Sequence, residues 1–278
     1  MTIAIIGSRG FVGTYLQKYF KGKNYKIITI KRAELHQKNT LHDKISQADI
    51  IINLSGANII QRWSKTYKKL LYQSRIETTK AIVNAVNCSN KDQLLISTSA
   101  IGIYENDILC DEDNYNYAET FLAHICKNWE KEAKKAKARV VIFRLGVVLG
   151  DGGALQKMLL PFKMGLGGKI GTGEQPFSYI HIHDLARAYE QVIQNHKLKG
   201  CFNLCSPYPS TNAAFTKVLA HKLNRFAFLP LPIFVLKLIF GDGATVLSDG
   251  QKVYPKRLLQ SGFVFDFETI EEVLDDLL

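Results

Sequence analysis

A glycine-rich loop near the start of the chain combines residue types and a spacing that bind an anionic ligand. Its sequence is Gly7-Ser8-Arg9-Gly10-Phe11-Val12-Gly13, and it follows an apolar segment and opens a helical pattern. The first glycine allows a tight turn, the second lets the backbone approach a pyrophosphate, and the third lets helix and strand pack closely. The helix N-terminus adds amide donors and partial positive charge. The loop therefore predicts a dinucleotide site, with a purely structural turn as the alternative.

The end of the second predicted strand distinguishes between two dinucleotides. A site for NAD has an acidic residue about 20 residues beyond the loop, which bonds the ribose 2′-hydroxyl. Here the strand is followed by Lys31 and Arg32, and the first acid is Glu34. Together with Arg9 in the loop, these cations suit a 2′-phosphate, so NADP is predicted in preference to NAD. The alternative is that Lys31 and Arg32 are simply solvated.

The elements that must position this loop alternate along the first half of the chain. Segments rich in isoleucine and valine, apolar on both faces, are predicted strands: Ile3–Ile6, Lys26–Ile30, Asp49–Leu54, Gln93–Thr98 and Arg139–Arg144. Helical patterns separate them, including one from Lys65 to Asn87. Strands buried on both faces and joined by helices form a parallel, doubly wound sheet with right-handed crossovers. The predicted fold class is α/β, with a Rossmann core.

The pattern changes after Gly150. A glycine-rich stretch, Gly165–Gly173, is followed by a strand-to-helix junction at Tyr179–Ala188 and then by a tail punctuated by prolines. Glycines permit the backbone angles that a closing lid needs, so the stretch is a candidate lid. Tight turns between elements are the alternative explanation.

These changes suggest two parts. We predict an NAD(P)-binding domain over residues 1–225, in which residues 151–180 lie partly on the lid and substrate side. A small α+β domain over residues 226–278 is predicted to close the substrate side. Within it, the apolar stretch Phe226–Phe240 is expected to form a core helix, and it is broken by two prolines and a lysine. That interruption makes it too short to span a bilayer.

The net charge raises the question of a polyanionic partner. The chain has 36 lysines and arginines against 25 acidic residues, a formal charge of +11. Two stretches, residues 62–80 and 127–139, hold twelve basic and three acidic residues, whereas residues 266–278 hold six acids and no base. Because no aromatic-interleaved basic motif or recognition helix accompanies this charge, we interpret both stretches as exposed helix faces. Neither nucleic acid nor membrane is expected as a partner.

Cysteine and histidine usage indicates neither disulfides nor a metal. The five cysteines are widely spaced and form no Cys-x-x-Cys pair. His181 and His183 share one face of a predicted strand, but we interpret this segment as a core strand feeding a helix that Asp184 caps. The chain begins with an apolar strand rather than a basic-then-apolar leader, so a cytoplasmic protein is expected.

Motifs along nearly the whole chain occur in the order found in a known family. They are Gly7–Gly13, Asn53-Leu54-Ser55-Gly56-Ala57, Arg62-Trp63, Ser74-Arg75, Ser97-Thr98-Ser99-Ala100-Ile101-Gly102, Phe121-Leu122-Ala123, Trp129-Glu130, Arg144-Leu145-Gly146, Tyr179–Leu185 and Gly250-Gln251-Lys252-Val253. The chain resembles the extended short-chain dehydrogenase/reductase superfamily. Within it, it is similar to the NAD-dependent epimerase/dehydratase-like "epimerase family protein" group, which carries a C-terminal domain of unknown function.

This resemblance implies where a cofactor and a substrate bind. The implied cofactor groove is lined by the glycine loop and by the ends of later strands, which comprise Leu54, Ser55, Gly56, Ser97, Thr98, Arg144 and Gly146. Independently of the family, ligands of open α/β sheets bind at the carboxyl ends of the strands. The substrate pocket is expected between this edge and the C-terminal portion. Arg75 is either a ligand for an anionic substrate group or a link between two helices through a carboxylate.

The same resemblance raises a question about catalysis. It implies a tyrosine acid/base, a lysine four residues later and a serine or threonine. A phenol with a pKa near 10 needs a neighbouring cation to act at neutral pH. Ser99 is the hydroxyl candidate, but the tyrosine and lysine positions hold Leu122 and Cys126. Leu122 cannot transfer a proton, and Cys126 supplies no permanent cation.

Several classes of function remain open from the sequence. The first is an atypical NADP-dependent oxidoreductase or epimerase for a small, sugar-like substrate. Its acid/base would be Tyr104 or His181, with Tyr115 and Tyr117 as second choices. The second is an NADP-binding sensor or regulator without turnover, and the third is a basic nucleic-acid or membrane-surface binder. The sequence does not determine the oligomeric state, and a homodimer is one candidate because dimers are common among similar folds.

Overall fold

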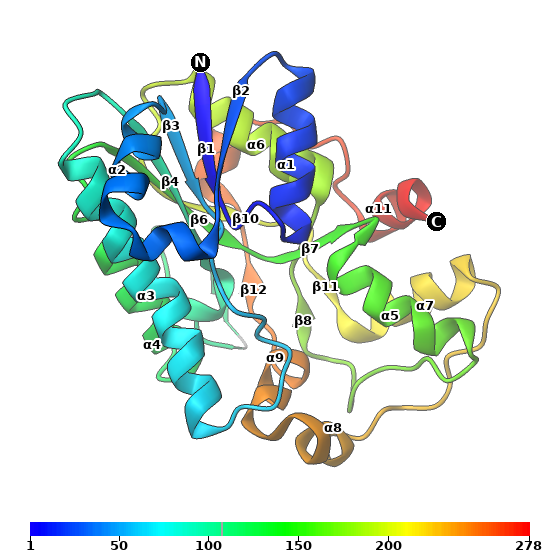
Figure 1. Ribbon diagram of the computed structural model, residues 1–278. Coiled ribbons are helices and arrows are strands. Elements are labelled where there is room, and N and C mark those ends of the chain that lie inside the picture. Colours follow the sequence, from blue (N-terminus) through cyan, green and yellow to red (C-terminus); the bar gives the residue numbers. More distant parts are fainter. Residues whose placement is uncertain (107) are drawn as a thin grey trace.

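A six-stranded parallel sheet forms the centre of the computed structural model, which describes residues 1–106 and 108–278 (Figure 1). Its strands are β1 (Thr2–Ile6), β2 (Lys26–Ile30), β3 (Ile50–Asn53), β4 (Leu94–Ala100), β6 (Arg139–Leu145) and β10 (Gly200–Leu204). The spatial order is β10-β6-β4-β3-β1-β2, and every neighbouring pair is parallel. The α/β class and the five predicted strands are confirmed, with ends that differ by a few residues.

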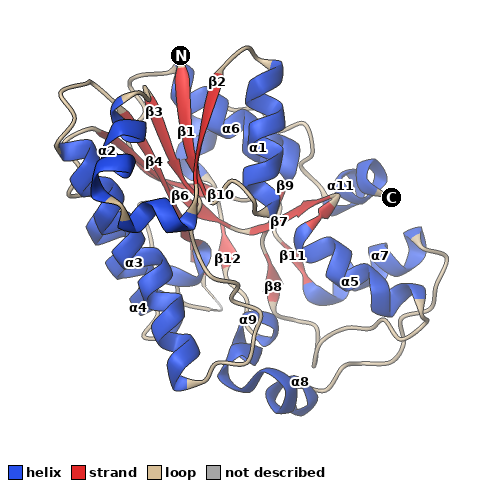
Figure 2. Cartoon of the chain, in the orientation of Figure 1, coloured by secondary structure: helices blue, strands red, loops and turns tan. Residues whose placement is uncertain are grey.

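Helices cover both faces of this sheet (Figure 2). One face carries α1 (Phe11–Gly22) and α6 (Ile182–Gln194), and the other carries α2 (Lys38–Ser46), α3 (Lys65–Asn87) and α4 (Phe121–Ala133). Successive residues of β1 point to opposite faces of the sheet. Ile3 and Ile5 pack against α1 and α6, and Ala4 and Ile6 pack against α2 and α3. This alternation explains why the strands are apolar at every position.

A smaller layer lies beside the core and is built from elements that come after β6 in the chain. It contains β7 (Val147–Gly150), α5 (Gly153–Lys163), β8 (Pro176–Phe177), β9 (Tyr179–His181), β11 (Ser210–Thr211), α7 (Asn212–Lys222) and α11 (Ile270–Leu277). The remaining elements are η1 (Arg32–His36), η2 (Ile101–Ile103), β5 (Leu109–Cys110), α8 (Ile233–Phe240), η3 (Gly241–Ala244), α9 (Thr245–Ser248), β12 (Lys252–Val253) and α10 (Lys256–Gln260). β7 pairs with β9, and β5 pairs with β12.

The C-terminal segment shares its core with the rest of the chain. Leu258, Phe263 and Phe265 belong to the same buried cluster as the central sheet. Val273 and Leu274 of α11 pack in the cluster that contains α5 and α7. Residues 226–278 therefore share a hydrophobic core with the rest of the chain.

The stretch Phe226–Phe240 was expected to be a core helix, and that prediction is wrong. Only its second half is helical, as α8, and Leu236 is its buried residue, whereas the side chains of Phe226 and Leu238 are 81% and 74% exposed. The reason is that α8 is apolar on nearly all sides. Such a helix needs neighbours all around it to be buried, and the fold covers one side.

Two smaller expectations also change. Asp184 was expected to cap α6, but His181 occupies the N-cap and Asp184 lies in the first turn, where it accepts hydrogen bonds from the amides of Asp266 and Phe267. The glycine-rich stretch Gly165–Gly173 is held against a neighbouring segment, since Gly171 N donates to Leu231 O at 2.9 Å. This pairing favours a structural turn over a lid.

Among the described helices, none is long and apolar enough to cross a membrane.

Candidate functional site

The glycine loop adopts a conformation that larger residues cannot share. Gly7 has a φ of +83°, and a Cβ added to it would lie 2.8 Å from Leu54 O. A Cβ on Gly13 would lie 2.4 Å from Gly7 O, so the third glycine allows α1 to pack on the turn. Gly10 is the N-cap of α1 and has no side chain, which leaves the amides of the first turn to bind a ligand. This geometry fits a phosphate group at the start of α1.

A cavity of about 1130 Å³ adjoins this loop and is lined by an excess of cations; we call it the basic cavity. Its basic residues are Arg9, Lys31, Arg32, Lys38 and Lys80. Among the described residues that line it, the acid is Glu77. Arg9, Lys31 and Arg32 were predicted from the sequence to act together, and the structure brings them to one cavity. Lys38 and Lys80 were missed, because they come from α2 and α3 and belong to no motif.

Glu34, the first acid after β2, is bound by neighbouring groups of the protein and is not free to bind a ligand. Its carboxylate accepts hydrogen bonds from Lys31 N at 2.7 Å and from Lys44 Nζ at 2.8 Å. The Lys44 ammonium, followed by the Lys31 amide, holds the pKa of Glu34 below its usual range. Glu34 therefore stabilises the turn after β2 and pairs with α2, and the basic cavity keeps its excess of positive charge.

A second cavity of about 1140 Å³, which we call the chamber, meets the basic cavity at Ser55 and Gly56. Both residues line both cavities and lie in the turn after β3. The chamber extends along the carboxyl ends of β4 and β6 to the C-terminal residues 241–251. The two cavities are thus neighbours along the edge of the sheet where ligands of such folds bind.

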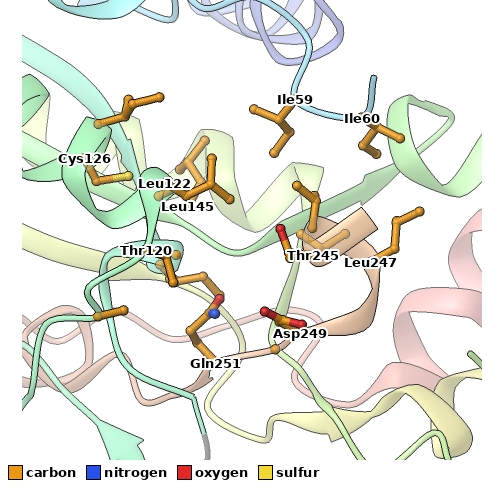
Figure 3. A pocket seen from close by; sticks show the side chains of 18 of the residues that line it. Ile59, Ile60, Thr120, Leu122, Cys126, Leu145, Thr245, Leu247, Asp249 and Gln251 are labelled. Atoms are coloured by element: carbon orange, nitrogen blue, oxygen red, sulfur yellow. The ribbon is translucent and has the colours of Figure 1, made fainter. Parts of the chain in front are cut away.

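The chamber has apolar walls and a polar end. Figure 3 shows Ile59, Leu122 and Leu145 projecting into it. Thr120, Asp249 and Gln251 supply polar atoms at another side. Asp249 and Gln251 were not predicted as site residues, although the matched motif Gly250-Gln251-Lys252-Val253 was the signal that could have identified them. A Cβ on Gly250 would lie 2.0 Å from Pro176 O, so this glycine allows the C-terminal segment to close the chamber.

The structure places Ser99, Leu122 and Cys126 at the chamber without a proton-transfer pair. The Ser99 side chain is buried, and its Oγ donates to Glu130 Oε1 at 2.9 Å. Leu122 and Cys126 lie one turn apart on α4. Burial raises the pKa of the Cys126 thiol to about 11, so this side chain is neutral at neutral pH.

Tyr104 and Arg144 belong to a buried polar network behind the chamber. Arg144 binds Glu130 through Nε at 2.7 Å and Nη2 at 2.8 Å, and its Nη1 donates to the Tyr104 hydroxyl at 2.6 Å. The Tyr104 hydroxyl donates in turn to Asn203 Oδ1 at 2.8 Å. Burial raises the pKa of Tyr104. Tyr104 lines the chamber, but its hydroxyl is engaged by Arg144 and Asn203, whereas Arg144 is buried in the core and lines neither cavity.

His181 is likewise built into the core. Its ring lies 4.0 Å from that of Phe267, and its Nδ1 accepts a hydrogen bond from His183 N. Burial lowers the pKa of His181, against the opposing effect of Asp276 and Asp184. Its role as an acid/base in the chamber has no geometric support, because it caps α6 beside the C-terminal helix.

The other predicted cofactor residues divide between the cavities and the core. The basic cavity includes Gly7, Ser8, Arg9, Lys31, Arg32, Ser55 and Gly56, and the chamber includes Leu54, Thr98 and Gly146. Phe11 packs against the turn after β7, where a Cβ on Gly153 would lie 2.6 Å from its ring. Val12 packs on the sheet, and Ser97 is buried. Among residues 1–106 and 108–278, no group of three or more His, Cys, Asp or Glu side chains is arranged to hold a metal ion.

Comparison with known proteins gives consistent matches. The profile of the NAD dependent epimerase/dehydratase family matches residues 3–205, and that of a domain of unknown function, DUF1731, matches residues 231–277. The chain is 32% identical over 292 residues to epimerase family protein SDR39U1 of Mus musculus, covering 100% of both proteins. It is 33% identical over 297 residues to epimerase family protein YfhF of Bacillus subtilis, covering 100% of this chain and 98% of YfhF.

A solved structure is similar to the whole fold. The crystal structure of human epimerase family protein SDR39U1 (isoform 2) with NADPH superimposes with a TM-score of 0.91 at 31% identity, covering 100% of this chain and 99% of the human one.

Proposed function

This chain belongs to the NAD dependent epimerase/dehydratase family, and from that premise we propose that it is an NADP(H)-dependent oxidoreductase for a small substrate. The observation that carries the proposal is that two neighbouring cavities share Ser55 and Gly56 in their linings. One end is basic and adjoins a phosphate-binding loop. The other end is apolar and closed by the C-terminal segment. A dinucleotide phosphate bound across both cavities would have its phosphates at the basic end and its nicotinamide in the chamber.

The residues at the basic end fit NADP(H) rather than NAD(H). The amides at the start of α1 would hold the pyrophosphate, and Arg9, Lys31 and Arg32 would hold the 2′-phosphate. Glu34 is bound by Lys44 and is not available to accept a ribose 2′-hydroxyl. The similar human protein crystallised with NADPH supports the same choice. When bound, the nicotinamide supplies hydride transfer.

The chamber would bind the substrate. Its walls of leucine, isoleucine and valine favour a largely apolar molecule, with polar contacts from Thr120, Asp249 and Gln251. Because Leu122 and Cys126 stand where the family resemblance implies the tyrosine and lysine, we assign proton transfer to the polar end. Asp249 is the acidic side chain at that end, and its carboxylate is exposed.

The cofactor assignment is tested by comparing NADPH and NADH. Replacing Arg9 and Arg32 with alanine removes two cations from the basic cavity. We expect NADPH binding, measured by calorimetry, to weaken roughly tenfold or more for each cation, because each one contributes a charge-assisted hydrogen bond. NADH binding should change little. Lys18→Ala, on the exposed face of α1, is the control. Equal losses for both dinucleotides would reject the assignment.

A second candidate function, an NADP(H)-binding sensor without turnover, is favoured by one observation. The Ser99 hydroxyl donates to Glu130 inside the core. The two positions where the family resemblance implies the catalytic tyrosine and lysine hold Leu122 and Cys126, which cannot replace them. NADPH oxidation would be followed with a panel of apolar aldehydes and ketones. Turnover that Asp249→Asn slows supports the oxidoreductase, whereas tight NADPH binding without turnover of any substrate supports the sensor.

A further inference from the structure

Arg75 is half-buried in the wall of the chamber, between two elements that meet there. It comes from α3 and lines the chamber. A Cβ added to Gly56 would lie 3.0 Å from its Cζ, so the turn after β3 covers the guanidinium closely. The Cζ atom also lies 5.4 Å from the ring centroid of Trp129 on α4. Arg75 is thus held in place by its neighbours.

The protein provides this cation with carbonyl oxygens but with no carboxylate. Nη1 donates to Leu71 O at 3.1 Å and Nη2 donates to Ala57 O at 3.0 Å. A guanidinium has five N–H donors, so three remain. In the part of the chain that the structure describes, no acidic side chain pairs with Arg75, whereas buried Arg144 is paired with Glu130 at 2.7 Å. Burial without a counter-ion lowers the pKa of Arg75.

Arg139 shows how an arginine without a carboxylate can otherwise be satisfied. Its Nη1 donates to the carbonyl oxygens of Val192, Asn195 and Leu198, at and just beyond the C-terminus of α6. That helix end carries partial negative charge, which compensates the cation. The carbonyl of Leu71 is in the middle of α3, so Arg75 has no such compensation. The partners of Arg75 are two carbonyl oxygens and the face of Trp129, and none of them carries a full negative charge. A cation that is partly removed from water and keeps free N–H donors favours an anionic ligand.

The ligand that completes Arg75 would sit in the chamber rather than in the basic cavity. Arg75 lines the chamber, whereas the glycine loop and the cations Arg9 and Arg32 line the basic cavity. Resting on the proposed function, we propose that Arg75 binds an oxyanion of the substrate, and that the substrate carries a carboxylate or phosphate on a largely apolar body. The planar fork of a guanidinium suits both groups, because two parallel N–H donors can address two oxygens.

The two tryptophans of the chain provide a direct test. Trp63 and Trp129 both line the chamber, and Trp63→Phe leaves Trp129, beside Arg75, as the reporter. Fluorescence of the cofactor-free protein would be titrated with hexanoate, hexyl phosphate and 1-hexanol. We expect one of the two anions to bind at least about tenfold tighter than hexanol, since a charge-assisted hydrogen bond is added. The stronger of the two anions distinguishes carboxylate from phosphate.

Variants assign this preference to Arg75. Arg75→Met is expected to abolish the difference between anion and alcohol, and Arg75→Lys should retain part of it. Lys68→Met is the matched control, because Lys68 lines the same chamber but is already paired with Asp242 at 2.6 Å. That variant should keep the preference for the anion.

Two results would overturn the proposal. The first is equal binding of hexanoate, hexyl phosphate and hexanol to the protein that retains Arg75, which is informative even if Arg75→Met does not fold. The second is unchanged anion binding in Arg75→Met combined with weaker NADPH binding, which would make Arg75 a cofactor residue. Because the titrations use cofactor-free protein, a failure of the NADP(H) proposal would not affect them.

Discussion

Glu130 connects the chamber with the core at the level of single residues. Its carboxylate accepts hydrogen bonds from Ser99 and from two nitrogen atoms of Arg144. Arg144 in turn donates to the hydroxyl of Tyr104. Removing one partner of such a buried pair leaves the other charge unpaired, which costs more than the pair itself contributes.

Glu130→Ala is therefore expected to lower the free energy of unfolding by about 3–5 kcal/mol. Chemical denaturation would measure it. Glu119→Ala is the control, because the Glu119 side chain is 93% exposed and pairs with Lys127 in solvent. Its loss should be about 0–1 kcal/mol. Comparable small losses in both variants would show that the Arg144 cation finds another partner.

His181 should make stability depend on pH. Burial lowers its pKa in the folded protein below the unfolded value of about 6.5, although Asp276 and Asp184 oppose this and His183 adds to it. The unfolded chain then binds a proton first as the pH falls. The stability that the neutral ring contributes is complete above about pH 6.5 and is lost below it.

We expect His181→Asn to reduce the loss of stability between about pH 7 and pH 5, since asparagine can still cap α6 without titrating in this range. Denaturation at several pH values would test this. His196→Asn, at an exposed position, should leave the slope unchanged. A wild-type slope in His181→Asn would assign the pH dependence to other groups.

At the level of elements, the position of α1 depends on the space that its glycines leave. The helix begins directly after the phosphate-binding turn, and Gly13 faces that turn. Gly22, at the other end of the same helix, faces open space, with no atom within 4 Å of an added Cβ among those described. One helix thus contains a glycine that the packing requires and one that it does not.

Gly13→Ala is expected to destabilise the protein by about 1–3 kcal/mol through overpacking, and to weaken NADPH binding because the start of α1 moves. Gly22→Ala should be neutral or stabilise by up to about 1 kcal/mol, since alanine is the better helix former. Thermal unfolding and calorimetric binding would measure both. The prediction fails if the two variants behave alike.

For the whole molecule, the C-terminal segment matters because it both closes the chamber and completes the core. Phe265 packs in the cluster of the central sheet, and Asp249 and Gln251 line the chamber. The match to the domain of unknown function begins at residue 231, but the hydrophobic core continues across that point of the chain.

The shared core predicts one cooperative unfolding transition, with equal calorimetric and van't Hoff enthalpies. Phe265→Ala should lower the midpoint of that whole transition, at a cost of about 3–5 kcal/mol. Phe234→Ala is the control, because this side chain on α8 is 71% exposed and should matter little. Two separate transitions, with only one affected by Phe265→Ala, would indicate independent domains.

The net charge is also explained at this scale. The formal charge of +11 was attributed to two exposed helix faces. The structure places most of the first stretch on α3, and Lys80 of this helix lines the basic cavity together with Arg9 and Lys31. Of the second stretch, Lys127 and Lys131 lie on α4, whereas its other basic residues follow that helix and Arg139 begins β6, so the expected helix face is only partly present. Part of the positive charge therefore surrounds the proposed phosphate site.

The sequence alone determined the local and periodic features. Strands apolar at every position predicted a parallel sheet, and the pattern from Lys65 to Asn87 matched α3. The glycine spacing, placed between strand and helix, predicted the tight turn that opens α1 beside the basic cavity. The match to the epimerase/dehydratase profile confirms the family resemblance. These features depend on neighbours within a few residues, so the order of the chain reveals them.

Only the tertiary structure decided which side chains meet. Arg75, Gly56 and Trp129 are far apart in sequence, and their proximity depends on how α3 packs on α4. The burial of Tyr104 and His181 and the exposure of α8 depend in the same way on which elements cover them. A residue's type sets what chemistry it can perform. Its access to a ligand is set by packing, which no local pattern records.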